Sequence, residues 1–93
     1  MEVQSFDNVW DALTDTPTEA ANMTARSDLL IALQRAIGSW GLTQEAAAKR
    51  LGITRPRISD LLAGKISKFS LDALVNVAAQ AGLAVEIRVS ETA

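Results

Sequence analysis

The sequence predicts an all-α fold, a bundle of about five helices followed by one short β-strand. Apolar residues recur at helical spacing over most of the chain, and capping residues or glycines separate the successive helical stretches. Strict alternation of apolar and polar residues occurs only near the C-terminus. With 93 residues, the chain has room for one hydrophobic core rather than two.

Composition narrows the possible functions, since the chain contains no cysteine, histidine or tyrosine. These absences exclude disulfides, thiolate or imidazole metal sites and a Ser-His-Asp triad. No carboxylate pair and no nucleophile beside a base stands out in the remaining sequence. The sequence therefore predicts a protein that is not an enzyme, with no catalytic residues, no metal and no cofactor.

The sequence also predicts a cytoplasmic protein without a membrane partner. No apolar run approaches the ~20 residues that a membrane-spanning helix needs. The first residues are not basic and no hydrophobic stretch follows them, so a secretory signal is not expected. The absence of cysteine fits a reducing compartment.

Residues 1–15 are predicted to form an acidic N-terminal segment with a short helix. Phe6, Val9, Trp10 and Leu13 recur at helical spacing within this segment. Two interpretations remain open for these apolar residues: they pack on the core of the bundle, or some of them face a partner protein.

A long helix is expected to begin after Thr16 and to end at Gly41. Thr16 is a capping residue, Pro17 suits the first helical position, and Glu19 completes a capping box. Gly41 is a natural C-terminal cap. One apolar stripe follows this helix and is interpreted as core; its members are Met23, Leu30, Leu33, Ile37 and Trp40.

Two short helices joined by a tight turn are predicted over residues 44–51 and 55–63. Thr43 and Thr54 supply their N-caps, and a glycine follows each helix. Such a pair, with basic and hydroxyl residues at the start of the second helix, is typical of a helix-turn-helix. The predicted DNA-binding domain covers residues 16–82.

Small and apolar residues fall where a helix-turn-helix needs them. Counting from Gln44, the fifth position is Ala48, which is small enough to let two helices approach closely. The ninth is Gly52, which can adopt the positive φ of the turn. The residues expected to pack inside the unit are Ala47, Leu51, Ile53, Ile58 and Leu61.

A last helix and a strand are predicted after a basic loop over residues 65–69. Ser70 caps the helix, and Gly82 closes it. Residues 83–89 alternate strictly, and a single strand leaves its backbone groups unpaired. We expect antiparallel pairing with the same strand of a second copy, with local pairing near residues 3–6 as the alternative. The predicted dimer interface is Leu83, Val85, Ile87 and Val89, and residues 90–93 are predicted to be a disordered tail.

The net charge of −2 hides an uneven distribution along the chain. Residues 43–70 carry six basic and two acidic side chains, a net charge of +4. Residues 1–30 carry six acidic side chains and one arginine, a net charge of −5. This asymmetry indicates two partners of opposite charge.

Residues 26–82 resemble the XRE (phage repressor and Cro) helix-turn-helix domain, which implies a lambda-repressor-like fold. The strings that carry this resemblance are LTQEAA (42–47), LGITRPRISDL (51–61) and GK (64–65). Three further strings resemble HigA-type antitoxins: FDNVWDAL (6–13), EAAN (19–22) and FSLDAL (69–74). That resemblance implies a sequence-specific repressor of its own operon that neutralises a basic, RelE- or HigB-like ribonuclease toxin.

The first turns of the second short helix supply the candidates for base contacts, because a recognition helix offers its N-terminal residues to the major groove. These candidates are Thr54, Arg55, Pro56, Arg57, Ser59 and Asp60. Arg55 is the first choice because arginine fits O6 and N7 of guanine. Arg57 lies about 200° away around the helix and is assigned to a base or a phosphate. Asp60 is predicted to accept from cytosine, to hold an arginine in place, or to be a solvated charge.

The candidates for phosphate contacts are Thr43, Gln44, Lys65, Lys68 and Ser70. Thr43 and Gln44 open a helix whose free amides and dipole favour an anion, and the family resemblance also places Gln44 at the DNA backbone. Lys49 and Arg50 are expected to be solvated. A two-fold dimer is expected to read palindromic double-stranded DNA.

Two alternatives to the antitoxin remain open. In the first, the chain is a stand-alone XRE-family regulator of phage origin without a toxin. In the second, it is a protein-interaction module whose basic patch is incidental. Salt-sensitive binding to duplex DNA separates the regulators from the interaction module.

Overall fold

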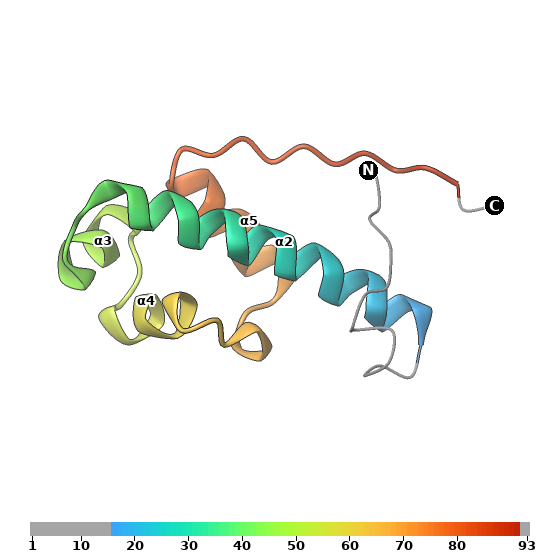
Figure 1. Cartoon of the computed structure of the whole chain (residues 1–93), viewed down its shortest axis with the longest axis horizontal. Helices are drawn as coiled ribbons and strands as arrows, with labels where there is room; N and C mark the ends of the chain where they lie inside the picture. Colours follow the sequence, from blue (N-terminus) through green and yellow to red (C-terminus); the bar gives the residue numbers. More distant parts are fainter. Residues whose placement is uncertain (1–15, 92–93) are drawn as a thin grey trace.

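The computed structural model describes residues 16–91, which form a helical unit followed by an extended segment (Figure 1). The predicted short helix within residues 1–15 lies outside this range. The elements in chain order are α2 (Pro17–Trp40), α3 (Gln44–Leu51), α4 (Arg55–Leu62), the 3-10 helix η1 (Ile66–Lys68) and α5 (Leu71–Gln80). Within residues 16–91, the all-α prediction is confirmed, but the predicted number of about five helices is not: this range holds four α-helices and one 3-10 helix.

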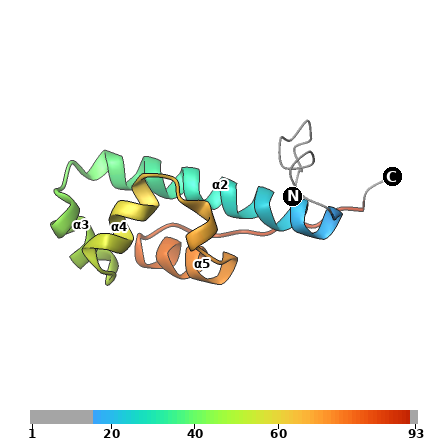
Figure 2. The ribbon, with the colours of Figure 1, turned by 90° about the horizontal axis from the view of Figure 1, so that it is seen from below.

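The long helix α2 is the support on which the other helices are placed. Its first turn is capped as expected, with the Glu19 N–H donating to Thr16 Oγ1 at 3.0 Å. It ends at Gly41, whose φ of 64° is the left-handed conformation that glycine adopts without strain. Figure 2 shows α3, α4 and α5 on one side of α2, so one face of the long helix is covered.

A single core lies between these helices. Its largest fully buried side chains are Leu33, Ile58, Leu61, Phe69 and Leu74, so α2, α4, α5 and the η1 region all contribute. The predicted stripe on α2 is buried in its middle and only half-buried at its two ends, Met23 and Trp40.

The predicted turn between α3 and α4 is confirmed. Gly52 has a φ of 69°, and its N–H donates to the Lys49 carbonyl at 3.2 Å. The Ile53 N–H donates to the Ala48 carbonyl at 3.0 Å, which closes the end of α3. Ala48 is buried in the core, and α3 packs against both α4 and α5.

The predicted β-strand over residues 83–89 is not confirmed in the part of the chain described here. Residues 83–91 are extended and run back toward the N-terminal end of α2, but no strand is formed within residues 16–91 (Figure 1). The alternation is present, yet a strand also needs a neighbour to receive its backbone hydrogen bonds. Leu83 packs against the core of its own chain, whereas Ile87 and Val89 are 75% and 89% exposed.

None of the helices within residues 16–91 combines the length and the apolar character that crossing a membrane requires.

Candidate nucleic-acid interface

The second helix of the predicted pair, α4, has one face in the core and one face in solvent. Ile58 and Leu61 are fully buried and fix the rotation of the helix about its axis. The predicted base-contacting residues Arg55 and Ser59 are exposed, one helical turn apart. Thr54 and Pro56 are exposed as well. Four of the six candidates therefore lie on the solvent side of a helix whose orientation the core determines.

The N-cap hydroxyls also keep a hydrogen available for a ligand. Thr54 Oγ1 accepts from the Arg57 N–H at 3.3 Å, and Thr43 Oγ1 accepts from the Ala46 N–H at 3.1 Å. Ser70 Oγ accepts from the Ala73 N–H at 3.1 Å in the same way. Because each hydroxyl uses only its oxygen in the cap, its O–H remains a donor that could bind a phosphate.

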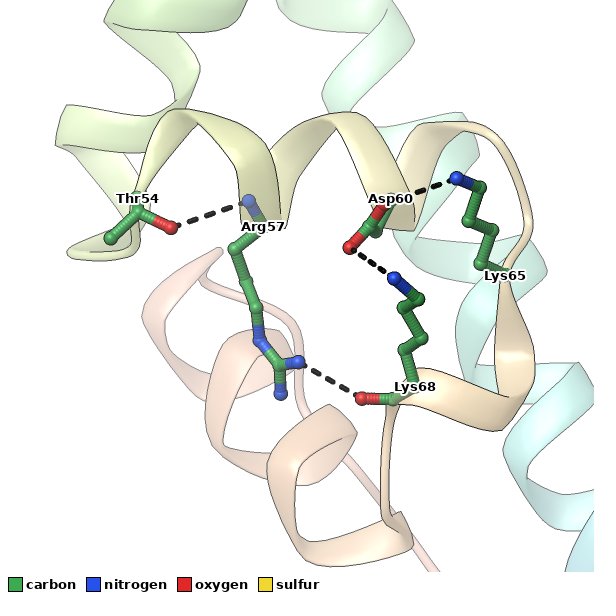
Figure 3. A network of polar contacts seen from close by, with 5 residues as sticks. All are labelled: Thr54, Arg57, Asp60, Lys65 and Lys68. Atoms are coloured by element: carbon green, nitrogen blue, oxygen red, sulfur yellow. Dashed lines mark hydrogen bonds and ion pairs between the residues drawn. The ribbon is translucent and has the colours of Figure 1, made fainter.

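Arg57, predicted to contact a base or a phosphate, has its guanidinium in contact with its own chain. Its Nη1 donates to the Lys68 carbonyl at 2.9 Å, and its Cζ lies 4.1 Å from the centre of the Phe69 ring. Figure 3 shows the side chain reaching from α4 to Lys68, the last residue of η1. In this arrangement, Arg57 connects α4 to the basic loop.

Asp60 forms ion pairs with two lysines of the loop, and not with an arginine. Its Oδ1 lies 3.5 Å from Lys65 Nζ, and its Oδ2 lies 3.7 Å from Lys68 Nζ. The carboxylate therefore sits between the two ammonium groups (Figure 3). Both lysines were predicted to contact phosphates, and the structure brings them together at the end of α4.

Two polar side chains of α2 hold this end of α4 and the following loop. Gln34 Nε2 donates to the carbonyls of Leu61 and Leu62 at 3.2 and 3.3 Å, which pairs two carbonyls at the C-terminus of α4. Arg26 Nη1 donates to the carbonyls of Ile66 and Phe69 at 3.3 and 3.1 Å. The sequence reasoning missed both residues. Helix ends with unpaired carbonyls are a local signal, but the donors come from 27 to 43 residues away.

Arg50 differs from the expected solvated charge in one respect. Its Cζ lies 3.8 Å from the centre of the Trp40 ring, so it stacks on the last residue of α2 while remaining exposed. Lys49 is exposed, as expected. The predicted phosphate contact Gln44 is the first residue of α3 and is exposed.

A family model described as a helix-turn-helix domain matches residues 12–90, which is most of the chain. A solved structure described as "Putative XRE Family Transcriptional Regulator" is similar to the chain with a TM-score of 0.70 and 32% sequence identity. The match covers 76% of this chain and 80% of that chain. The chain belongs to the XRE-type helix-turn-helix family. No curated protein matches the sequence.

The helix-turn-helix of this XRE-type chain is therefore the α3–α4 pair. The family match supports the first of the two resemblances seen in the sequence. The structure adds that two residues of its recognition helix, Arg57 and Asp60, are engaged with the loop over residues 65–69.

Proposed function

We propose that this chain is a sequence-specific, DNA-binding transcriptional regulator that places α4 in the major groove. The observation that carries the proposal is the position of Arg55, which is exposed at the start of a helix whose opposite face is fixed by the core. The similarity to a solved XRE-family regulator at 32% identity supports the same function.

In this proposal, contacts with DNA divide into two groups. Base edges are contacted by the exposed residues Thr54, Arg55, Pro56 and Ser59, and by the partly buried Asp60. Phosphates are bound by Thr43 and Gln44 at the start of α3, by Lys65 and Lys68 in the loop, and by Ser70 at the start of α5. Arg57 acts mainly by holding the loop to α4, because its guanidinium is already bound to the Lys68 carbonyl.

The dependence of DNA binding on salt tests the proposed function. Two of the proposed phosphate contacts, Lys65 and Lys68, carry a charge, so the affinity for a random-sequence duplex is expected to fall about 10-fold per bound copy between 50 and 200 mM salt, or about 100-fold for two copies bound together. Fluorescence anisotropy with a labelled duplex measures this fall. A chain that binds no duplex, or whose binding does not change with salt, contradicts the proposal and favours the interaction module.

We propose that the regulator acts as a homodimer joined through residues 83–89. Val85, Ile87 and Val89 are exposed and alternate along an extended segment, so pairing with a second copy would cover them and supply the missing hydrogen bonds. Such a dimer would read two half-sites about 34 Å apart.

Replacing one apolar residue of this segment tests the dimer. Ile87→Glu is expected to convert the dimer to a monomer in sedimentation velocity, because it buries a charge at the interface. Ala84→Glu, on the opposite side of the alternation, adds the same charge and is expected to leave the dimer intact. A chain that sediments as a monomer before any substitution would contradict the proposal.

We further propose that the regulator is the antitoxin of a toxin–antitoxin pair. The support is the charge of the N-terminal third, which carries six acidic side chains and one arginine over residues 1–30, and the resemblance to HigA-type antitoxins. An acidic segment suits a basic ribonuclease partner. The tagged chain is expected to copurify with the basic product of an adjacent reading frame, and to lose it when residues 1–15 are deleted. Absence of any such partner favours the stand-alone regulator.

A further inference from the structure

We propose that Asp60 determines specificity by restraining the two phosphate-binding lysines of the loop. In the free protein, its carboxylate neutralises part of the charge of Lys65 and Lys68. On most DNA, the transfer of these lysines to phosphates leaves the carboxylate unpaired and weakens binding; DNA that offers Asp60 a hydrogen-bond donor removes this cost. This inference rests on the proposed DNA-binding function and assigns a discriminating role to one residue of it.

The geometry of the cluster places one lysine on each oxygen of the carboxylate. The distances from Oδ1 to Lys65 Nζ and from Oδ2 to Lys68 Nζ are 3.5 and 3.7 Å. Both exceed the range of about 2.7–3.2 Å for a direct hydrogen bond, so these are loose ion pairs. The lysine side chains are 54% and 55% exposed and the Asp60 side chain is 24% exposed, which leaves the ammonium groups accessible to a competing anion.

The backbone around the cluster is held in place from several directions. The Lys65 N–H donates to the Asp60 carbonyl at 3.0 Å, and Arg57 holds the Lys68 carbonyl at 2.9 Å. Arg26 of α2 binds the carbonyls of Ile66 and Phe69 on either side of Lys68. Because these bonds fix the chain, the lysines change partner by rotating their flexible side chains rather than by moving the loop (Figure 3).

The effect on affinity of moving the two lysines from Asp60 to DNA phosphates depends on the DNA sequence. Exposed ion pairs contribute little to stability, so a DNA phosphate can take both lysines from the carboxylate. Asp60 is then left without a cation beside the negatively charged DNA backbone, and this like-charge contact opposes binding. A cytosine N4 amino group within reach of the recognition helix donates a hydrogen bond to the carboxylate, and this bond offsets the repulsion between Asp60 and the DNA backbone. Asp60 therefore weakens binding to most DNA sequences but not to a sequence that places a cytosine beside it.

The first test replaces Asp60 by its neutral isostere. Asp60→Asn is expected to bind a random-sequence 24-bp duplex about 5- to 10-fold more tightly, with a steeper dependence on salt as both lysines reach phosphates. Its affinity for a duplex enriched from a random pool by the wild-type chain is expected to stay level or to fall. The ratio of specific to random binding should therefore drop at least about fivefold. Asp60→Ser, which removes the same charge, is expected to behave alike.

Asp28→Asn is the matched control. Asp28 is exposed on α2, and this substitution changes the net charge of the chain by the same amount as Asp60→Asn. It is expected to alter the affinity for either duplex by less than about twofold. Thermal unfolding followed by circular dichroism is expected to show all three variants folded, since exposed ion pairs contribute little.

A double-mutant cycle tests whether Asp60 acts through the lysines. Lys68→Gln is expected to weaken binding to random duplex about 2-fold in the wild-type chain and about 10-fold in the Asp60→Asn background, where the lysine is no longer restrained. Equal effects in both backgrounds overturn the proposal. The proposal is also overturned if Asp60→Asn changes the affinity for random duplex no more than Asp28→Asn does, or if it binds random duplex more weakly than the wild type. Wild-type protein that binds no duplex at all overturns the proposed DNA-binding function instead.

Discussion

Replacing Arg55 with alanine is expected to reduce sequence-specific DNA binding about 10- to 100-fold while leaving the fold intact. The side chain is exposed, and no hydrogen bond or ion pair with another residue of the described range 16–91 holds it. A guanidinium that pairs with O6 and N7 of guanine contributes roughly 1–3 kcal/mol of discrimination between bases. The measurement is a competition between the enriched duplex and random duplex, followed by fluorescence anisotropy.

Arg35→Ala is the matched control for Arg55→Ala. Arg35 is an exposed arginine on α2, outside the α3–α4 pair, and its replacement removes the same charge. We expect a change of less than about threefold in either affinity, because a distant exposed charge is screened by salt. Undiminished specific binding by Arg55→Ala would show that Arg55 is not the base-reading residue.

Replacing Phe69 with alanine is expected to destabilise the chain by about 3–5 kcal/mol, the usual cost of truncating a buried phenylalanine. Phe69 is 1% exposed and also supports the guanidinium of Arg57 on its ring. In a domain of this size, 1 kcal/mol shifts the midpoint of thermal unfolding by about 4–8 °C, so a fall of at least ~12 °C should be seen. Thermal and urea unfolding followed by circular dichroism measure both quantities.

Phe69→Leu separates the two contributions of this ring. Leucine keeps most of the buried apolar volume, so its cost is expected to be about 1–2 kcal/mol, including the loss of the contact with Arg57. Alanine and leucine variants that are both within ~1 kcal/mol of the wild type would contradict the placement of Phe69 in the core.

The elements that could be predicted from the sequence are those whose causes are local. Thr43 and Thr54 each cap a helix by accepting a hydrogen bond from the amide three residues later. Both partners of each bond are therefore visible in a short stretch of sequence. Gly52 ends α3 because the turn requires a positive φ at that position. The exposed side of α4 followed from the apolar positions Ile58 and Leu61, which had to face inward.

The features that the sequence could not reveal depend on residues far apart in the chain. Arg57 is predicted to contact DNA from its type and position, and only the fold shows that Phe69 and the Lys68 carbonyl also lie within its reach. Gln34 and Arg26 looked like ordinary polar residues of a long helix until the carbonyls of α4 and η1 were placed beside them. The strand over residues 83–89 was predicted from alternation alone, which indicates a suitable side-chain pattern but supplies no partner.

Mapping the surface that meets DNA tests the central claim most directly, that the exposed side of α4 enters the major groove. Amide NMR spectra of the full chain are recorded while the enriched duplex is added. The largest changes are expected at Thr54, Arg55 and Ser59, with smaller ones at Gln44 and Lys68, and none at Asp28 on the far side of α2. Changes centred on residues 83–89 or on α2, with α4 unaffected, would contradict the claim.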